Sequence, residues 1–138
     1  MYLVDTNVLS ETRRARPHGA VLAWLDSVPE NTLFFSAVSV GEIQKGIEKA
    51  HDTDPEKARQ IEGWLETLTG FGTVIPMGSA EFRRWAKFMH RRSNDFSEDA
   101  MIAATADIHG LAVATRNVKD FQQFDVPVVN PFEYGRSN

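Results

Sequence analysis

Four acidic residues lie at or near the points where short apolar segments of this sequence end. Asp5 comes directly after the first such segment, and Glu42 lies one helical turn beyond the second. Asp99 opens an alanine-rich stretch, and Asp120 follows a later apolar run. Carboxylate oxygens are the hard ligands that Mg²⁺ takes in proteins. If the fold brings these side chains together, they can form a metal site.

Each of these acids also has a purely local explanation. Asp5 fits the N-cap of a following helix, for which Asp is a preferred type. Ser39 and Glu42 fit the S-x-x-E capping box, and Asp99 can complement the positive end of a helix dipole. Asp120 fits an exposed loop. For any one residue this alternative stays open, but four caps need not converge on one edge of a sheet, so the combination favours a metal site.

The elements that must position these residues follow from hydrophobic periodicity. Apolar runs alternate with stretches of helical spacing, which predicts an α/β fold with a parallel sheet covered by helices on both faces. In such sheets ligands bind outside the carboxyl ends of the strands, near the point where the strand order switches. The predicted strands are 2–4, 32–36, 72–76, 111–115 and 126–130, and the predicted helices are 8–12, 21–28, 40–47, 55–68, 79–92 and 97–110, the last closed by Gly110.

Length and composition limit the possible classes of protein. The chain has 138 residues, of which 42% are hydrophobic and 25% charged, and this is typical of one globular domain. No cysteine is present, which excludes disulfides, thiolate metal sites and a cysteine nucleophile. We find neither a signal peptide nor an apolar stretch of membrane-spanning length, so we expect a cytoplasmic protein without a membrane partner. The net charge is −4, so a nucleic acid would have to be held by local basic patches or a cation.

Several motifs together resemble one family. The stretches "LVDTNVLSE" (3–11), "SAVSVGEIQKG" (36–46), "EDAMIAATADIHGLAVATRN" (98–117) and "VVNP" (128–131) are similar in order and spacing to PIN-domain ribonucleases. The resemblance is strongest to the VapC and FitB-type toxins of bacterial toxin–antitoxin pairs. It implies a single PIN domain over residues 1–138, with a three-layer α/β/α architecture and a mainly parallel sheet of about five strands. It also implies metal-dependent cleavage of single-stranded RNA.

The resemblance also implies a set of site residues. Asp5, Glu42 and Asp99 match the catalytic acids that would hold Mg²⁺ or Mn²⁺, with Asp5 and Asp99 as direct ligands. Glu42 would be a ligand or would orient a water molecule. Many relatives carry aspartate at the position of Asn117, so either Asn117 or Asp120 could complete the site. Carboxylates crowded together repel one another, so we expect a strained pocket when no cation is bound.

Other residues of the motifs would support this site. Thr6, Ser36 and Thr115 match supporting polar positions, and Arg116 stands where it could hold a phosphate of the RNA. A cognate antitoxin of the VapB kind is the partner that the family implies, together with a homodimer and a possible higher toxin–antitoxin assembly. The loop with Arg13, Arg14 and Arg16 and the basic stretch 83–92 are either RNA contacts or solvated surface.

Two other functions compete with this interpretation. A haloacid-dehalogenase-like phosphatase requires D-x-D after the first strand, and here the third residue is Asn7. A receiver domain requires adjacent acids at that point together with a lysine after a late strand, and this pattern is not met. A catalytically inactive PIN-like scaffold, acting only through protein or RNA binding, is the alternative that the unusual fourth position keeps open.

Overall fold

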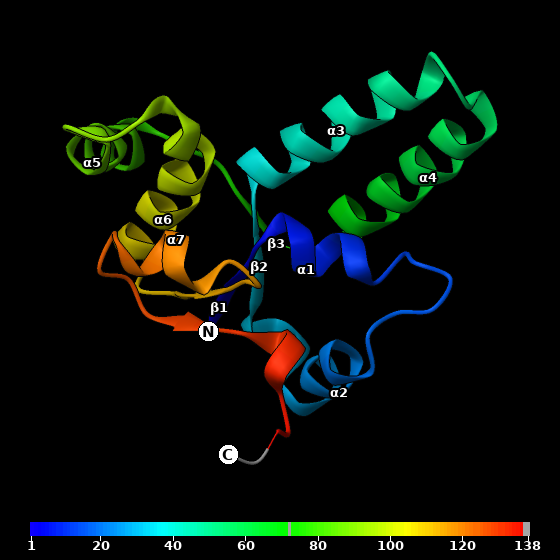
Figure 1. Cartoon of the computed structure of the whole chain (residues 1–138), viewed down its shortest axis with the longest axis horizontal. Coiled ribbons are helices and arrows are strands. Elements are labelled where there is room, and N and C mark those ends of the chain that lie inside the picture. Colours follow the sequence, from blue (N-terminus) through cyan, green and yellow to red (C-terminus); the bar gives the residue numbers. More distant parts are fainter. Residues whose placement is uncertain (72, 137–138) are drawn as a thin grey trace.

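The computed structural model describes residues 1–71 and 73–136, which form a parallel sheet covered by helices (Figure 1). Every strand pair is parallel, and the strand order is β3-β2-β1-β4-β5. The central strand β1 therefore lies between β2 and β4, and the strand order switches beside it. The strands are β1 (Tyr2–Val4), β2 (Leu33–Ser36), β3 (Thr73–Ile75), β4 (Ala112–Ala114) and β5 (Val128–Val129).

Helices pack on both faces of this sheet. In Figure 1 the helices α5 to α7 lie on one side of the strands, whereas α1, α2 and the hairpin of α3 and α4 lie on the other. The helices are α1 (Thr6–Glu11), α2 (Gly19–Ser27), α3 (Ala37–His51), α4 (Pro55–Phe71), α5 (Ser79–Met89), α6 (Ser97–His109) and α7 (Val118–Gln122), with short 3₁₀ turns at η1 (Glu30–Thr32), η2 (Asn94–Phe96) and η3 (Pro131–Glu133).

The alternation of side chains along the strands gives the molecule two main apolar cores. On β1, Leu3 packs into the core beneath α6, whereas the next residue, Val4, packs into the core beneath α1 and α2. On β2, Phe34 and Phe35 divide between the same two cores. Because successive side chains of a strand point to opposite faces, buried residues in succession require cover on both sides. The predicted three-layer α/β/α architecture is confirmed.

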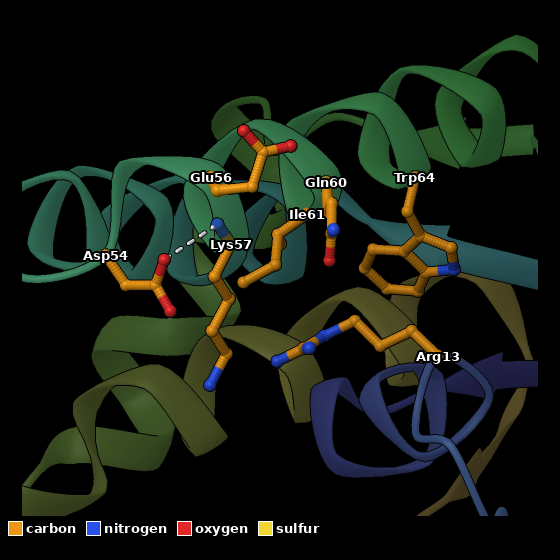
Figure 2. Close-up of a pocket in the computed structure, with 7 residues that line it drawn as sticks. All are labelled: Arg13, Asp54, Glu56, Lys57, Gln60, Ile61 and Trp64. Carbon is orange, nitrogen blue, oxygen red and sulfur yellow. Dashed lines mark hydrogen bonds between the residues drawn. The ribbon is translucent and has the colours of Figure 1, made fainter.

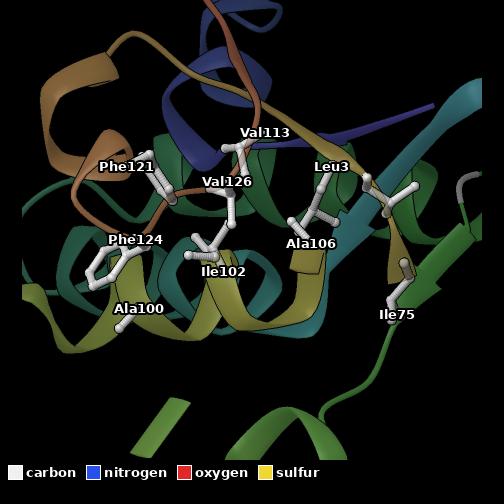
Figure 3. Packing of buried hydrophobic residues seen from close by; sticks show 11 residues of the cluster. Leu3, Ile75, Ala100, Ile102, Ala106, Val113, Phe121, Phe124 and Val126 are labelled. Atoms are coloured by element: carbon white, nitrogen blue, oxygen red, sulfur yellow. The ribbon is translucent and has the colours of Figure 1, made fainter. Parts of the chain in front are cut away.

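The alanine-rich helix α6 lies close to the sheet. Ala100, Ala103 and Ala106 are fully buried in the core that they share with Leu3 and Phe121, among others (Figure 3). Side chains this small let the helix axis approach the strands. Gly110 ends the helix with φ of +67°, a left-handed conformation that glycine adopts without a steric cost. This packing fixes the height of Asp99 above the sheet.

The element boundaries differ from the predictions in informative ways. The helix predicted to reach residue 92 ends at Met89, because His90 leaves the helical region and Arg91 takes a positive φ of 62°. The capping box of Ser39 and Glu42 is wrong. Helix α3 begins at Ala37, so Ser39 lies within the first turn. Helix α7 was not predicted, and the first residue of the predicted strand 72–76 lies outside the described residues.

Within residues 1–71 and 73–136, no helix combines the length and the hydrophobicity that crossing a bilayer would demand.

Candidate active site

Asp5 lies at the carboxyl end of the central strand and is buried, with 4% of its surface exposed. It is the N-cap of α1, and its Oδ1 accepts a hydrogen bond from the backbone N–H of Thr6 at 2.8 Å. Its Oδ2 accepts from the hydroxyl of Thr115 at 2.7 Å and from the amide of Asn7 at 3.2 Å. Burial raises the pKa of Asp5, and the hydrogen bonds from Thr115 and Thr6 partly oppose that shift. Asp5 therefore caps a helix, and the cap uses only one of its two oxygens.

The turn after β4 holds Asp5 from the neighbouring strand. Thr115, fully buried, donates its hydroxyl proton to Asp5 and accepts a hydrogen bond from the backbone N–H of Asn117 at 3.0 Å. Asn7 bridges the same two segments, because its Oδ1 accepts from the backbone N–H of Arg116 at 3.2 Å. These bonds cross from the end of β1 to the end of β4, which is the switch point of the sheet. The carboxylate of Asp5 is thus held by two strands.

Glu42 reaches the same region from α3. The hydroxyl of Thr6 lies 2.8 Å from Oγ of Ser39 and 3.1 Å from Oε1 of Glu42, so it can donate to either side chain. The pKa of Glu42 rises to about 7, mainly because the carboxyl is half-buried, and the nearby charges of Glu98 and Asp5 raise it further. The hydrogen bond from Thr6 opposes this rise. Near neutral pH, Glu42 is therefore a carboxyl group that gains or loses a proton readily.

Asp99 lies in the first turn of α6. Its pKa rises to about 6, first through burial and then through the charges of Asp5, Asp120 and Glu98. The charge of Asp5 therefore acts on both Glu42 and Asp99, although the end of β1, α3 and α6 bring the three acids from separate parts of the chain. Burial raises the pKa of all three acids, and neighbouring charges raise those of Glu42 and Asp99 further.

Two residues are candidates for the fourth position of the site. Asn117 is exposed, and its recorded hydrogen bond uses the backbone N–H. Asp120 lies in the first turn of α7, half-buried, and its charge contributes to the raised pKa of Asp99. Of these two candidates, Asp120 is the one that acts electrostatically on the acidic cluster.

Three residues of this neighbourhood were not among the predicted site residues. Glu98 adds a charge beside Glu42 and Asp99, while Asn7 and Ser39 hold Asp5 and Thr6. Only Glu98 and Asn7 have a signal in the sequence, because Glu98 is next to Asp99 and Asn7 lies two residues after Asp5. Ser36, predicted as a supporting hydroxyl, is the N-cap of α3 and accepts from Val38 N–H at 3.1 Å. It therefore supports the helix that carries Glu42.

The donor set fits a hard divalent cation. Asp5, Glu42 and Asp99 offer carboxylate oxygens on buried or half-buried side chains with raised pKa values, and a cation would offset both the cost of burying their charges and their repulsion. As the side chains stand in the described ranges, no three His, Cys, Asp or Glu groups are drawn together around one point. An ion there would be held by one or two carboxylates, which is the usual arrangement for Mg²⁺ with water and substrate phosphate.

Arg116 is exposed beside this cluster. Its guanidinium lies over the ring of Phe132, with 4.5 Å between Cζ and the ring centroid. Together with Arg13, Arg14 and Lys57 it lines a shallow pocket of about 580 Å³. Cations are therefore concentrated next to the acids, on a chain whose net charge is −4.

The basic stretch 83–92 has a different role in the structure. Arg92 lies 5.0 Å above the ring of Phe124 and donates to the backbone carbonyl of Gln123 at 2.9 Å. Arg84 forms an ion pair with Asp107 at 2.9 Å. At least these two arginines tie α5 to the rest of the molecule.

Comparison with known proteins identifies the class. The family model described as "PIN domain" matches residues 2–127, which is most of the chain. The chain belongs to the PIN domain family.

Curated relatives match over nearly the whole length. The VapC ribonuclease Y4jK of Sinorhizobium fredii is 35% identical over 141 aligned positions, covering 96% of this chain and 99% of the relative. The toxin FitB of Neisseria gonorrhoeae is 36% identical with the same coverage.

Solved structures agree with this placement. The FitAcB complex from Neisseria gonorrhoeae contains a chain with a TM-score of 0.84 and 32% identity, over 96% of this chain and 99% of that one. The structure of FitAB bound to an IR36 DNA fragment contains a chain with a TM-score of 0.83 and 32% identity, and the match covers both chains completely. VapBC-1 from nontypeable Haemophilus influenzae, at 21% identity and a TM-score of 0.73, shares the fold.

Proposed function

We propose that this protein is a metal-dependent endoribonuclease and the toxin of a toxin–antitoxin pair. The observation that carries the proposal is the approach of Asp5, Glu42 and Asp99 to one another at the switch point of the sheet, where burial raises the pKa of each and the charge of Asp5 raises those of Glu42 and Asp99 further. Full-length relatives named as a VapC ribonuclease and as the toxin FitB support the same reading. PIN-domain relatives of this kind generally depend on a divalent metal, and we propose Mg²⁺ or Mn²⁺ here.

The chain's own residues prepare the site for hydrolysis of an RNA phosphodiester. Asp5, fixed by Thr115 and Thr6, and Asp99, fixed by α6, would hold the cation. The bound ion would supply positive charge against the developing negative charge of the phosphate and would lower the pKa of water. Glu42, with a pKa of about 7, can take a proton from a water molecule near neutral pH and release it again.

The partner is an antitoxin that occupies this region. The solved relatives include the FitAcB and FitAB complexes, and this chain covers the matched chain of each almost completely. We therefore propose that a VapB-like or FitA-like antitoxin binds this chain and blocks access to the acidic cluster. Homodimerisation remains a prediction from the family.

The test is cleavage of a total RNA pool by the purified, antitoxin-free chain in Mg²⁺ or Mn²⁺. Wild type should produce fragments that disappear on chelation and in Asp5→Asn. Asp26→Asn is the matched control, because it removes an exposed carboxylate of α2 and should cleave as wild type does. Metal binding without cleavage by the wild type, together with binding of RNA or antitoxin, would instead support the inactive scaffold.

A further inference from the structure

Two of the cations beside the acidic cluster have no role assigned so far. Arg13, which follows the end of α1, and Lys57, in the first turn of α4, point into the same space between these helices (Figure 2). Both side chains are exposed. Among the ion pairs recorded for the described residues, neither Arg13 nor Lys57 takes part in one.

The position of Lys57 is unfavourable for the helix itself. A cation in the first turn opposes the positive end of the helix dipole. The neighbouring acid Glu56 does not neutralise it, since Glu56 pairs with Arg59 at 2.7 Å. Asp54 caps the helix by accepting from the backbone N–H of Lys57 at 3.2 Å, rather than from its ammonium group. Helix stability therefore does not explain the lysine.

The loop that carries Arg13 is held in place. Glu11, 7% exposed, accepts from the backbone N–H of His18 at 3.0 Å and from Arg14 at 3.3 Å. One buried carboxylate thus fastens both the beginning and the end of the basic loop. Its cost of burial is offset by these two bonds, and their effect is to keep the loop beside α4.

Arg13 and Lys57 connect the acidic cluster with the other cations. Both line a cavity of about 260 Å³ whose wall includes Thr6 and Glu42. Both also line the pocket of about 580 Å³ that Arg116 shares. A polyanion whose scissile phosphate lies at the acidic cluster would therefore meet Arg13 and Lys57 with an adjacent part of its backbone.

We propose that Arg13 and Lys57 form a phosphate subsite for the RNA backbone next to the scissile bond. This inference rests on the proposed function, because it names the part of the molecule that receives the flanking RNA. An arginine fork and a lysine ammonium are the side chains that bind phosphate oxygens most directly. Their charges offset the repulsion between an acidic protein and RNA, so they contribute to affinity rather than to the chemical step.

The experiment measures binding rather than cleavage. Fluorescence anisotropy of labelled single-stranded oligouridylate is recorded with Asp99→Asn protein in Mg²⁺ over a range of salt concentrations. Each phosphate contact on a single strand adds about 0.7 to the slope of log affinity against log salt. Adding Arg13→Gln and Lys57→Gln should therefore weaken binding and reduce the slope by about 1.4. The matched control, Arg83→Gln with Lys87→Gln, removes two exposed charges of α5 and should leave the slope unchanged.

Each outcome has one meaning. Three results would overturn the subsite. The first is an equal loss of RNA affinity in both double variants, and the second is an unchanged salt slope in the Arg13→Gln and Lys57→Gln variant. The third is no RNA binding at all. The same holds if the two substitutions weaken only the complex with co-expressed antitoxin, since the cations would then belong to that interface. Wild type that binds RNA with the predicted slope but never cleaves it would retain the subsite and refute the nuclease. If wild type cleaves RNA but the Arg13→Gln and Lys57→Gln variant keeps the salt slope unchanged, the nuclease is retained and the subsite is refuted.

Discussion

At the scale of single residues, the hydroxyl of Thr115 is the contact that holds Asp5 most tightly. Its hydrogen bond to Oδ2 of Asp5 measures 2.7 Å, and both residues are buried. A hydrogen bond to a charged group contributes about 1.5–3 kcal/mol to stability. The bond also opposes the effect of burial on the pKa of Asp5. Thr115 therefore keeps this carboxylate both in place and easier to ionise.

We predict that Thr115→Val lowers the free energy of unfolding by about 2 kcal/mol at neutral pH, because it leaves a buried carboxylate oxygen with one partner fewer. Urea denaturation measures this change. Thr67→Val is the control, since Thr67 is exposed and bonds only within its own helix, to the carbonyl of Gly63. Equal losses in the two variants would show that Thr115 has no special role.

A second prediction concerns the repulsion around Asp99. Its pKa of about 6 lies above the ordinary value of 3.8, so the folded protein favours the protonated form. This group therefore contributes stability at low pH that is lost as pH rises through about 6. In metal-free protein, Asp99→Asn should raise the free energy of unfolding by about 1 kcal/mol near pH 8, after allowance for partial exposure.

The gain from Asp99→Asn should shrink near pH 4, where the wild-type carboxyl is protonated in the folded state. Denaturation curves of both proteins at the two pH values provide the measurement. Asp26→Asn, which changes an exposed acid, should stay within about 0.5 kcal/mol of wild type throughout. A pH-independent effect of Asp99→Asn would mean that the repulsion is absent.

The residue types of the site could be predicted from the sequence, but their partners could not. Asp5, Glu42 and Asp99 stand out because they adjoin apolar segments and match a family motif. The bonds from Asn7 and to Ser39 depend on how α1 meets α3 and the turn after β4, so they have no signature in a linear pattern. Arg116 was expected near the pocket, and its stacking on Phe132 depends on the fold of the C-terminal segment.

At the scale of elements, α6 sets the geometry of the site through its small side chains. Ala103 is fully buried against the core that contains Leu3. A larger residue there must push the helix away from the sheet, and Asp99 moves with it. Overpacking of this kind costs about 1–3 kcal/mol.

We predict that Ala103→Leu destabilises the fold by about 2 kcal/mol and also lowers RNA cleavage in the molecules that remain folded. Thermal denaturation gives the first quantity and cleavage at a temperature below the transition gives the second. Ala86→Leu on α5 provides the control, because Ala86 is exposed and tolerates the added volume. If Ala103→Leu were as stable and active as wild type, the close approach of α6 would be irrelevant.

The elements themselves were largely predictable, and each miss has a local cause. Strands such as β1 and helices such as α4 are long or strongly patterned enough to stand out from their surroundings. Helix α7 has only five residues, and short helices carry too few periodic positions to be recognised. The start of α3 was misplaced because Ser36 and Ser39 are both suitable caps, and only the tertiary structure chooses Ser36.

At the scale of the whole molecule, the fold brings acids from three distant segments to one edge of the sheet. Asp5 follows the end of β1, whereas Glu42 and Asp99 come from α3 and α6, and the strand order β3-β2-β1-β4-β5 puts the switch point beside β1. The molecule therefore carries a concentrated negative charge in its metal-free form, which opposes folding. Binding of a cation should stabilise the entire domain.

We predict that Mg²⁺ and Mn²⁺ raise the melting temperature of the purified chain, and that they do so more at about pH 8 than at about pH 6. A ligand that binds only the folded state stabilises it, and the ion competes with protons on Glu42 and Asp99, whose pKa values are about 7 and 6. Differential scanning fluorimetry detects the shift. In Asp5→Asn the shift should vanish, and a shift that persists there would place the ion elsewhere.

The central claim is that the acids at the switch point bind the divalent cation on which RNA cleavage depends. Calorimetric titration of metal-free protein with Mn²⁺ in buffers of different ionisation enthalpy tests it most directly. We predict binding by wild type and Asp26→Asn, with protons released near neutral pH as Glu42 and Asp99 ionise, and much weaker binding by Asp5→Asn and Asp99→Asn. Wild type that binds no ion, or Asp5→Asn and Asp99→Asn proteins that bind it as tightly as wild type, would contradict the claim.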